Sequence, residues 1–107
     1  MLLIRRSLHK TNSTPVSGGT VEVASFLDLG SAPPVVNLQS TIITQPGTYT
    51  IFDTGSGIKW GGSVLPALAN LNDKIDIKVP AGYAVQATYV DSTGLKVKVV
   101  VRKANVL

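Results

Sequence analysis

Alternation of apolar and polar residues with a period of two is the strongest pattern along the chain. In Lys74–Val79, isoleucine and valine alternate with lysine and aspartate, and Leu95–Arg102 repeats the pattern with valine and lysine. Each segment predicts a β-strand with one face in a core and the other in water. Tyr83–Val90 lies between them and is rich in β-prone residues, and the turn sequences Pro80–Gly82 and Asp91–Gly94 separate the three segments. The C-terminal third is therefore predicted to be an antiparallel meander.

Further strands are predicted nearer the N-terminus. Ser40–Gln45 and Thr48–Asp53 flank Pro46-Gly47, a residue pair suited to the middle of a turn, and together they predict a hairpin. Thr20–Phe26 is another strand candidate. Leu2–Leu8 is predicted to be either an edge strand or an extended arm.

Only Val64–Leu71 suggests a helix, because Ser63 can cap it and three leucines follow at helical spacing. Many short strands punctuated by Gly and Pro predict an all-β fold. We expect an antiparallel β-sandwich or a Greek-key/jelly-roll barrel with at most one short helix. Residues 1–12 are predicted to form an N-terminal arm or edge strand, and residues 13–107 a single β-sandwich domain.

The chain carries few charges for its length. It has 107 residues, which suits one domain, and only 15% of them are charged, against about 25% in an average soluble domain. The formal net charge is +4 and 44% of the residues are hydrophobic, so the composition does not favour intrinsic disorder. No apolar run approaches the roughly 18 residues of a membrane helix, so no membrane span is expected.

The chain contains no cysteine, which removes disulfides, thiol catalysis and thiolate metal sites. No cluster of other metal ligands replaces them, so we expect no cofactor. At the N-terminus, Arg5 and Arg6 follow only a few apolar residues, whereas a secretory signal places its charges first. The expectation is synthesis in the cytoplasm without processing.

Catalytic residues are scarce. The single histidine, His9, has no nucleophile elbow or phosphate-binding loop near it. The segment Phe52–Ser56, Phe-Asp-Thr-Gly-Ser, resembles the signature of aspartic proteases. The resemblance implies a homodimer in which Asp53 of each subunit activates water. The chain lacks the glycine-containing element that supports this loop near the C-terminus of the family, so we favour a turn in which Asp53 caps backbone donors, and a protein that is not an enzyme.

The segment Asn72–Tyr83 resembles the junction between Greek-key motifs in βγ-crystallin domains. Asn72 and Asp73 match the first pair of the calcium motif, but Asp76 and Ile77 occupy the positions of its two hydroxyl residues. Calcium needs six to eight oxygen ligands, more than this segment offers. The resemblance thus implies a Greek-key arrangement without a calcium site.

Trp60 stands among glycines and has two interpretations. On a displayed loop it would stack on a sugar ring or anchor a protein partner. In a closed domain its indole would instead cover one end of the core, which is the commoner place for a single Trp. A carbohydrate-binding β-sandwich module is therefore an alternative function, and a glycan is an alternative partner.

Basic residues gather in two places, at the N-terminus and in the last strand. Nucleic-acid binding would call for aromatic residues interleaved with these cations, whereas the few aromatics mostly lie elsewhere in the sequence. Lysines on an outward face more often prevent edge strands from pairing with other chains. The sequence therefore does not favour a nucleic-acid partner. The two clusters are Arg5, Arg6, His9 and Lys10, and Lys96, Lys98, Arg102 and Lys103.

A surface poor in charge and rich in small polar residues is typical of repeated subunit contacts. From Pro15 to Gly57 the chain has no Lys or Arg and only three acidic residues. In overall character the protein resembles the small β-rich structural proteins of phage virions, of the capsid decoration (cement) or spike type. This resemblance implies a location in the virion and major capsid or other virion subunits as partners, and the composition favours a homo-oligomer. The predicted partner-binding residues are Leu2, Ile4, Arg5, Arg6, Leu8 and Trp60.

Overall fold

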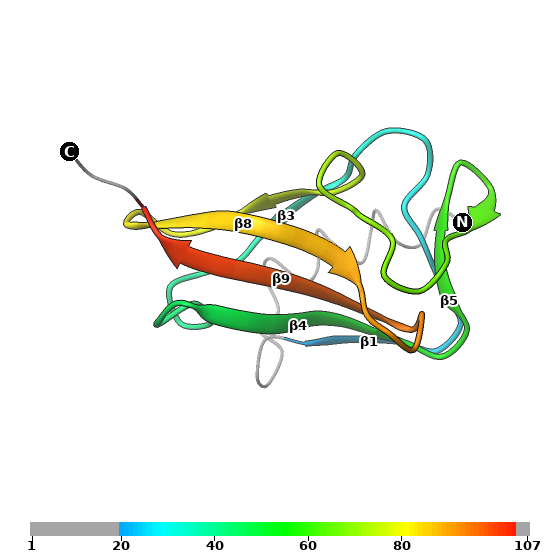
Figure 1. The fold of residues 1–107 in the computed structure, drawn as a ribbon, viewed down its shortest axis with the longest axis horizontal. Helices are drawn as coiled ribbons and strands as arrows, with labels where there is room; N and C mark the ends of the chain where they lie inside the picture. Colours follow the sequence, from blue (N-terminus) through cyan, green and yellow to red (C-terminus); the bar gives the residue numbers. More distant parts are fainter. Residues whose placement is uncertain (1–19, 105–107) are drawn as a thin grey trace.

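A computed structural model describes residues 20–104, which form nine short β-strands and no helix. The strands group into three sheets, and Figure 1 shows the largest of them, formed by β1, β4, β9 and β8, across the length of the molecule. In chain order the strands are β1 (Val21–Val23), β2 (Phe26–Asp28), β3 (Val35–Asn37), β4 (Gly47–Thr54), β5 (Gly57–Trp60), β6 (Ser63–Val64), β7 (Asp76–Lys78), β8 (Tyr83–Val90) and β9 (Lys96–Lys103).

The sheets are mixed. Sheet A has the order β1-β4-β9-β8, sheet B the order β2-β5-β6, and sheet C consists of β3 and β7. The pairs β4–β9, β8–β9 and β5–β6 are antiparallel, as the sequence predicts for this class. The pairs β1–β4, β2–β5 and β3–β7 are parallel, and this departs from the expected purely antiparallel arrangement.

Two chain segments pass together from sheet A into sheet B. β1 continues into β2 after Ala24-Ser25, and β4 continues into β5 after Gly55-Ser56. The registers Val23↔Thr54 and Phe26↔Gly57 place the two breaks side by side. The predicted strand Thr20–Phe26 is therefore two strands that meet at a bend.

One hydrophobic cluster joins the three sheets. Alternate residues of β9 point into it, and β4 contributes the fully buried Phe52. Burial of this many aliphatic side chains, each worth about 1.5–3 kcal/mol, is the main stabilising term of the fold. Its buried members are Leu27, Leu29, Val36, Leu38, Ile43, Ile51, Phe52, Ile58, Leu71, Ile75, Ile77, Val90, Val97, Val99 and Val101.

The helix predicted for Val64–Leu71 is wrong. Pro66 lacks a backbone donor, and Leu68 has a positive φ of 65° that ends any helical path. The leucines do not share a face either, since Leu71 is fully buried whereas Leu68 is 67% exposed. The backbone of this segment pairs with strands instead, with Leu65 N donating to Ile58 O and Leu71 N donating to Thr88 O.

Two strand pairings also differ from the prediction. Ser40–Gln45 forms turns and irregular backbone, so β4 pairs with β1 and β9 and has no hairpin partner at Pro46-Gly47. The predicted meander is confirmed for β8 and β9, but β7 pairs with β3 and not with β8. The predicted arm, residues 1–12, lies outside the described residues.

Candidate interaction surfaces

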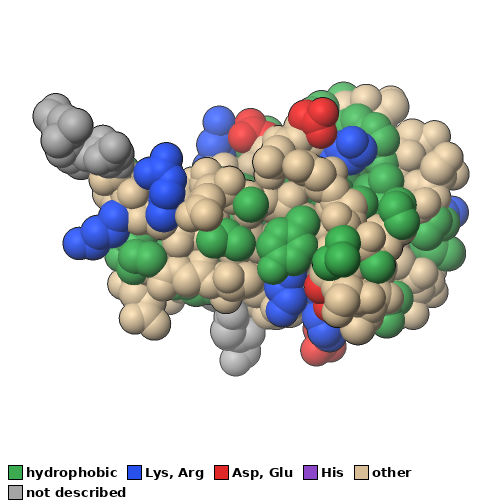
Figure 2. Space-filling model, in the orientation of Figure 1, with side chains coloured by type: hydrophobic (Ala, Val, Ile, Leu, Met, Phe, Trp, Pro, Cys, Tyr) green, Lys and Arg blue, Asp and Glu red, His purple; other side chains and the backbone are tan. Residues whose placement is uncertain are grey.

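The outer face of sheet A carries a strip of apolar residues beside the lysines of β9. Because side chains alternate along a strand, the burial of Val97 and Val99 turns Lys98 and Val100 outward. Val100 lies between Thr48 of β4 and Ala87 of β8. Figure 2 shows apolar side chains along the middle of this face, over β8 and β9, with Lys and Arg beside them. We define the outer patch as Thr48, Thr50, Ala87, Tyr89, Lys98 and Val100.

The lysines of β9 on this face have partners within sheet A. Lys98 Nζ donates a 2.5 Å hydrogen bond to Thr50 Oγ1. Lys96 Nζ lies 3.0 Å from Asp53 Oδ1, and both side chains are more than one-third exposed. Such exposed ion pairs contribute little stability, about 0–1 kcal/mol, but they neutralise charge across the face.

Tyr89 is an aromatic residue that lies among the basic residues on the outer face of sheet A. Tyr89 is the cross-strand neighbour of Lys98, on the same face as Lys96 and Arg102. Sequence reasoning missed this contact because it depends on the register of β8 against β9. A single tyrosine among partnered lysines falls short of the row of stacking aromatics that single-stranded nucleic acid requires.

The Asp-Thr-Gly segment, Asp53–Gly55, lies where β4 ends and the chain bends toward β5. Asp53 belongs to strand β4 and pairs with Lys96, so its carboxylate faces a cation on the outer face. Thr54 is buried, and its hydroxyl donates to Leu95 O at 2.7 Å and accepts from Gly57 N at 3.0 Å. Gly55 N donates to Val23 O at 2.9 Å. Thr54 and Gly55 therefore hold the β4–β5 bend, whereas Asp53 joins β4 to β9 as a strand residue and is not part of the turn that the sequence predicts. The geometry lends the protease interpretation no support.

The β8–β9 turn is organised by Asp91. Its Oδ1 accepts hydrogen bonds from the Thr93 hydroxyl at 2.7 Å, from Thr93 N at 3.1 Å and from Lys96 N at 3.2 Å. Partial burial acts to raise the pKa of Asp91, but the Thr93 hydroxyl and the backbone donors outweigh it and lower the pKa below 3.8, its ordinary value. The carboxylate is thus a structural acceptor.

Trp60 is neither fully displayed nor fully buried. It ends β5 at a two-residue turn, Gly61-Gly62, where both glycines have a positive φ as a tight hairpin turn requires. Its side chain packs partly against the core, and Lys74 Nζ lies 5.8 Å from the ring centroid. The Trp60 ring therefore packs partly against the core and also makes a cation–π contact with Lys74.

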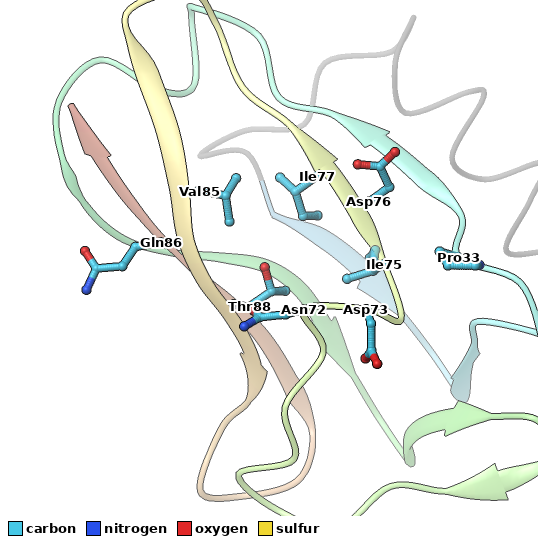
Figure 3. A pocket seen from close by; sticks show the side chains of 9 residues that line it. All are labelled: Pro33, Asn72, Asp73, Ile75, Asp76, Ile77, Val85, Gln86 and Thr88. Atoms are coloured by element: carbon cyan, nitrogen blue, oxygen red, sulfur yellow. Dashed lines mark hydrogen bonds between the residues drawn. The ribbon is translucent and has the colours of Figure 1, made fainter. Parts of the chain in front are cut away.

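A groove separates β7 from β8. It has a volume of about 500 Å³. Figure 3 shows Ile75, Ile77 and Val85 pointing into the space between the two strands, whereas Gln86 points away on the other side of β8. Asn72 closes one end, since its Oδ1 accepts a 2.8 Å hydrogen bond from Thr88 N. The groove is lined by Pro33, Asn72, Asp73, Ile75, Asp76, Ile77, Val85, Gln86 and Thr88.

The structure places one of the predicted partner-binding residues, Trp60, and sets it apart from the outer patch by putting it in sheet B. The other five, Leu2, Ile4, Arg5, Arg6 and Leu8, lie outside the described residues. The alternation in β9 already indicates that Val100 is an outward apolar residue among lysines. The groove had no signal in the sequence, because it arises from the pairing of β7 with β3.

No family model, curated protein or solved structure matches the chain. Within residues 20–104, no helix is long and apolar enough to cross a membrane. The same residues contain no group of three or more His, Asp or Glu side chains that could hold a metal ion.

Proposed function

We propose that this protein is a non-enzymatic structural component of a viral particle, a capsid decoration (cement) protein or spike module that binds neighbouring subunits. An apolar strip on the outer face of sheet A is the observation that supports it most. Val100, Ala87 and Tyr89 form this strip, and enrichment of tyrosine is typical of the centre of a protein interface. Lys98 lies within the patch opposite Tyr89, where it donates a hydrogen bond to Thr50, and Lys96 and Arg102 lie farther along β9.

The charge-poor half of the chain supports the same function. The stretch Pro15–Gly57 lacks any cation, and its described part supplies β1 to β4 and their loops. Many of its side chains are exposed and neutral, among them Gln39, Ser40, Thr41, Thr44 and Gln45. A standard interface buries roughly 1,600 Å² in total, which a domain of this size reaches by contacting two neighbours.

For the architecture, we propose a two-layer sandwich with sheet A as one layer and sheets B and C as the other. Side chains of β3 and β7 share the hydrophobic cluster with those of β9. In Figure 1, β3 passes behind β8. A sandwich of this kind leaves the outer face of sheet A free for a partner.

Mass spectrometry of purified virions tests the viral assignment, and gene neighbourhood provides a second test. The chain should be found in the particle and among genes for virion proteins. Its absence from both would reject the viral role.

A surface substitution tests the role of the outer patch. Thr48→Lys adds a charge at an exposed position beside Val100 and should weaken co-sedimentation with the particle about tenfold or more. Val64→Lys is the matched control, because Val64 is 54% exposed on sheet B, away from the patch. Equal loss in both variants, or none in either, would contradict docking through this face.

Deletion of Met1–Lys10 tests the predicted arm. Extended arms bind neighbours by adding a strand to an exposed sheet edge. We expect the deletion to abolish binding to the particle while the far-UV circular dichroism spectrum stays the same. Unchanged binding would remove the arm from the proposal and leave the outer patch as the docking surface.

A further inference from the structure

The outer face of sheet A carries opposite charges at its two ends. Where β9 begins, Glu22 of β1 and Asp53 of β4 are cross-strand neighbours, and Asp53 forms an ion pair with Lys96. Arg102 lies six residues farther along β9 than Lys96, beyond Val100. Glu22 adds a carboxylate to the neutral Asp53–Lys96 pair, so this end of the face is negative and the Arg102 end is positive.

The side chains of Glu22 and Arg102 both point outward from sheet A. Val21 and Val23 pack against the core and Val101 is buried, so alternation turns the residues next to them to the outer face. Among residues 20–104, neither Glu22 nor Arg102 forms an ion pair. Six residues of a strand span about 20 Å, more than twice the screening length of about 8 Å at physiological salt. The two charges therefore cannot neutralise each other within one copy.

A two-fold axis across the strands at the level of Val99 would bring these unlike ends together if two copies packed face to face. Arg102 and Lys96 lie three residues on either side of Val99, so Arg102 of one copy comes to the level of Lys96 in the other. Packed sheets are turned by about 30° relative to each other, which moves β9 sideways by about 5 Å at a distance of about 10 Å from the axis. This shift equals one strand spacing and, in the usual sense of the turn, carries β9 toward β4 of the other copy. Arg102 then lies over Glu22 and Asp53 of that copy.

The same axis matches large side chains with small ones. Tyr89 and Lys98 form one row across the face, and Ala87 and Val100 form the next row. The axis lies between these rows, so the Tyr89–Lys98 row of one copy covers the Ala87–Val100 row of the other. An axis at the level of Lys98 would instead place two lysines against each other, and like charges that meet in an interface are strongly unfavourable. Size and charge therefore select the same register.

We propose that the outer patch is covered by the outer patch of a second copy, in a two-fold dimer that Arg102 holds by binding Glu22 and Asp53 of the other copy. An arginine can bind a carboxylate through two parallel hydrogen bonds, and the two-fold axis repeats the contact on both sides of the interface. This inference rests on the proposed function, because it identifies the neighbouring subunit at the outer patch. The dimer binds the particle through two copies at once, so variants that weaken it also weaken attachment to the particle.

Carbodiimide cross-linking of the full chain tests the contact. Arg102→Lys keeps the positive charge and introduces an amine, which carbodiimide joins to a nearby carboxylate as an amide. We expect covalent dimers whose cross-linked peptides join position 102 to Glu22 or Asp53. These positions are about 20 Å or more apart within one copy, so the link reports a contact between copies. Covalent dimers joined only at other positions, or no covalent dimer, would overturn the proposal.

A charge exchange tests the same pairing without cross-linking. Arg102→Glu and Glu22→Lys should each weaken self-association about tenfold or more in analytical ultracentrifugation, and the double variant should regain most of the loss. Lys103→Glu is the matched control, because it changes the net charge as Arg102→Glu does, at the next residue of β9 and on the opposite side of the strand. It should leave the dissociation constant within about threefold. A double variant as weak as the single variants, or an equal loss with Lys103→Glu, would contradict the pairing.

Co-sedimentation with purified particles separates this inference from the proposed function. A chain that stays monomeric up to near-millimolar concentration and still binds the particle would reject the second copy and leave the proposed function standing. Particle binding that both single variants lose and the double variant does not regain would assign the outer patch to a different subunit, and would also overturn the dimer. A dimer confirmed by the cross-links in a protein absent from virions would instead reject the proposed function alone.

Discussion

A side chain at position 55 would clash with the backbone of the neighbouring segment just after the paired strands β1 and β4 end. A Cβ atom at this position would lie 2.4 Å from Ala24 O, a backbone atom that cannot move aside cheaply. The close approach allows the Gly55 N–H to reach Val23 O and the Ser56 N–H to reach Ser25 O. The glycine of the Asp-Thr-Gly triplet therefore has a structural reason that is unrelated to catalysis.

We expect Gly55→Ala to destabilise the fold by roughly 1–3 kcal/mol, because the backbone of β1 or β4 must shift to admit the methyl group. Urea denaturation followed by circular dichroism measures the free energy of unfolding. Ser56→Ala, at the exposed neighbouring position, is the control and should change it by less than about 0.5 kcal/mol. Similar stability of the two variants would show that the bend relaxes without cost.

Asp91 makes the stability of the β8–β9 turn depend on pH. Its pKa is lowered in the folded state, so its stabilising contribution is complete above the ordinary value of 3.8 and is lost as the pH falls through the folded value. At pH 7 we expect Asp91→Ala to cost about 1.5–3 kcal/mol, because hydrogen bonds to a charged acceptor are removed. Unfolding titrations at pH 7 and pH 3 should show the difference from the unmodified chain shrinking at the lower pH. The exposed variant Asp73→Ala should show a smaller cost at pH 7, and a pH-independent effect of Asp91→Ala would argue against the charged acceptor.

At the scale of elements, periodicity located strands more reliably than it located their partners. Tyr83–Val90 coincides with β8, and Leu95–Arg102 differs from β9 by one residue at each end. Both can be predicted because alternation depends only on neighbouring residues. The pairing of β7 with β3 could not be predicted, since it joins residues about forty positions apart and leaves no local pattern. The leucine spacing in Val64–Leu71 led to a wrong helix prediction for the same reason. Backbone hydrogen bonds from this segment to Thr88 and Ile58 outweigh its local helix propensity.

Sheet C should open before sheet A. β3 and β7 have three residues each and form a two-stranded sheet, whereas β9 lies between β4 and β8 with Val97, Val99 and Val101 buried. Hydrogen exchange of native protein followed by NMR measures the free energy of opening for each amide. We expect the amides of Leu38 and Asp76, which bond across sheet C, to exchange faster than those of Val97 and Val99. Equal protection would show that the three sheets open as one cooperative unit.

For the whole molecule, the sequence indicates a surface poor in charge but not which residues come together on it. A shortage of charge between Pro15 and Gly57 is visible in the composition, and the outward position of Val100 follows from alternation. Its neighbours Thr48, Ala87 and Tyr89 are brought to it from β4 and β8 by cross-strand registers that no local pattern encodes. The groove beside β7 has the same origin. Surfaces built by pairing of distant strands therefore become visible only in the structure.

The proposed assembly role predicts a thermal stability that depends on protein concentration. Contacts between folded copies stabilise only the folded state, so each tenfold rise above the dissociation constant adds about 1.4 kcal/mol by mass action, or roughly 5–10 °C in Tm for a domain of this size. Differential scanning calorimetry from micromolar to near-millimolar protein measures the shift. The variant Thr48→Lys, which changes an exposed position of the outer patch, should flatten the dependence while keeping the Tm of dilute protein. A Tm that stays constant across this range in the unmodified chain would contradict a homo-oligomer and leave binding to other subunits as the sole role of these surfaces.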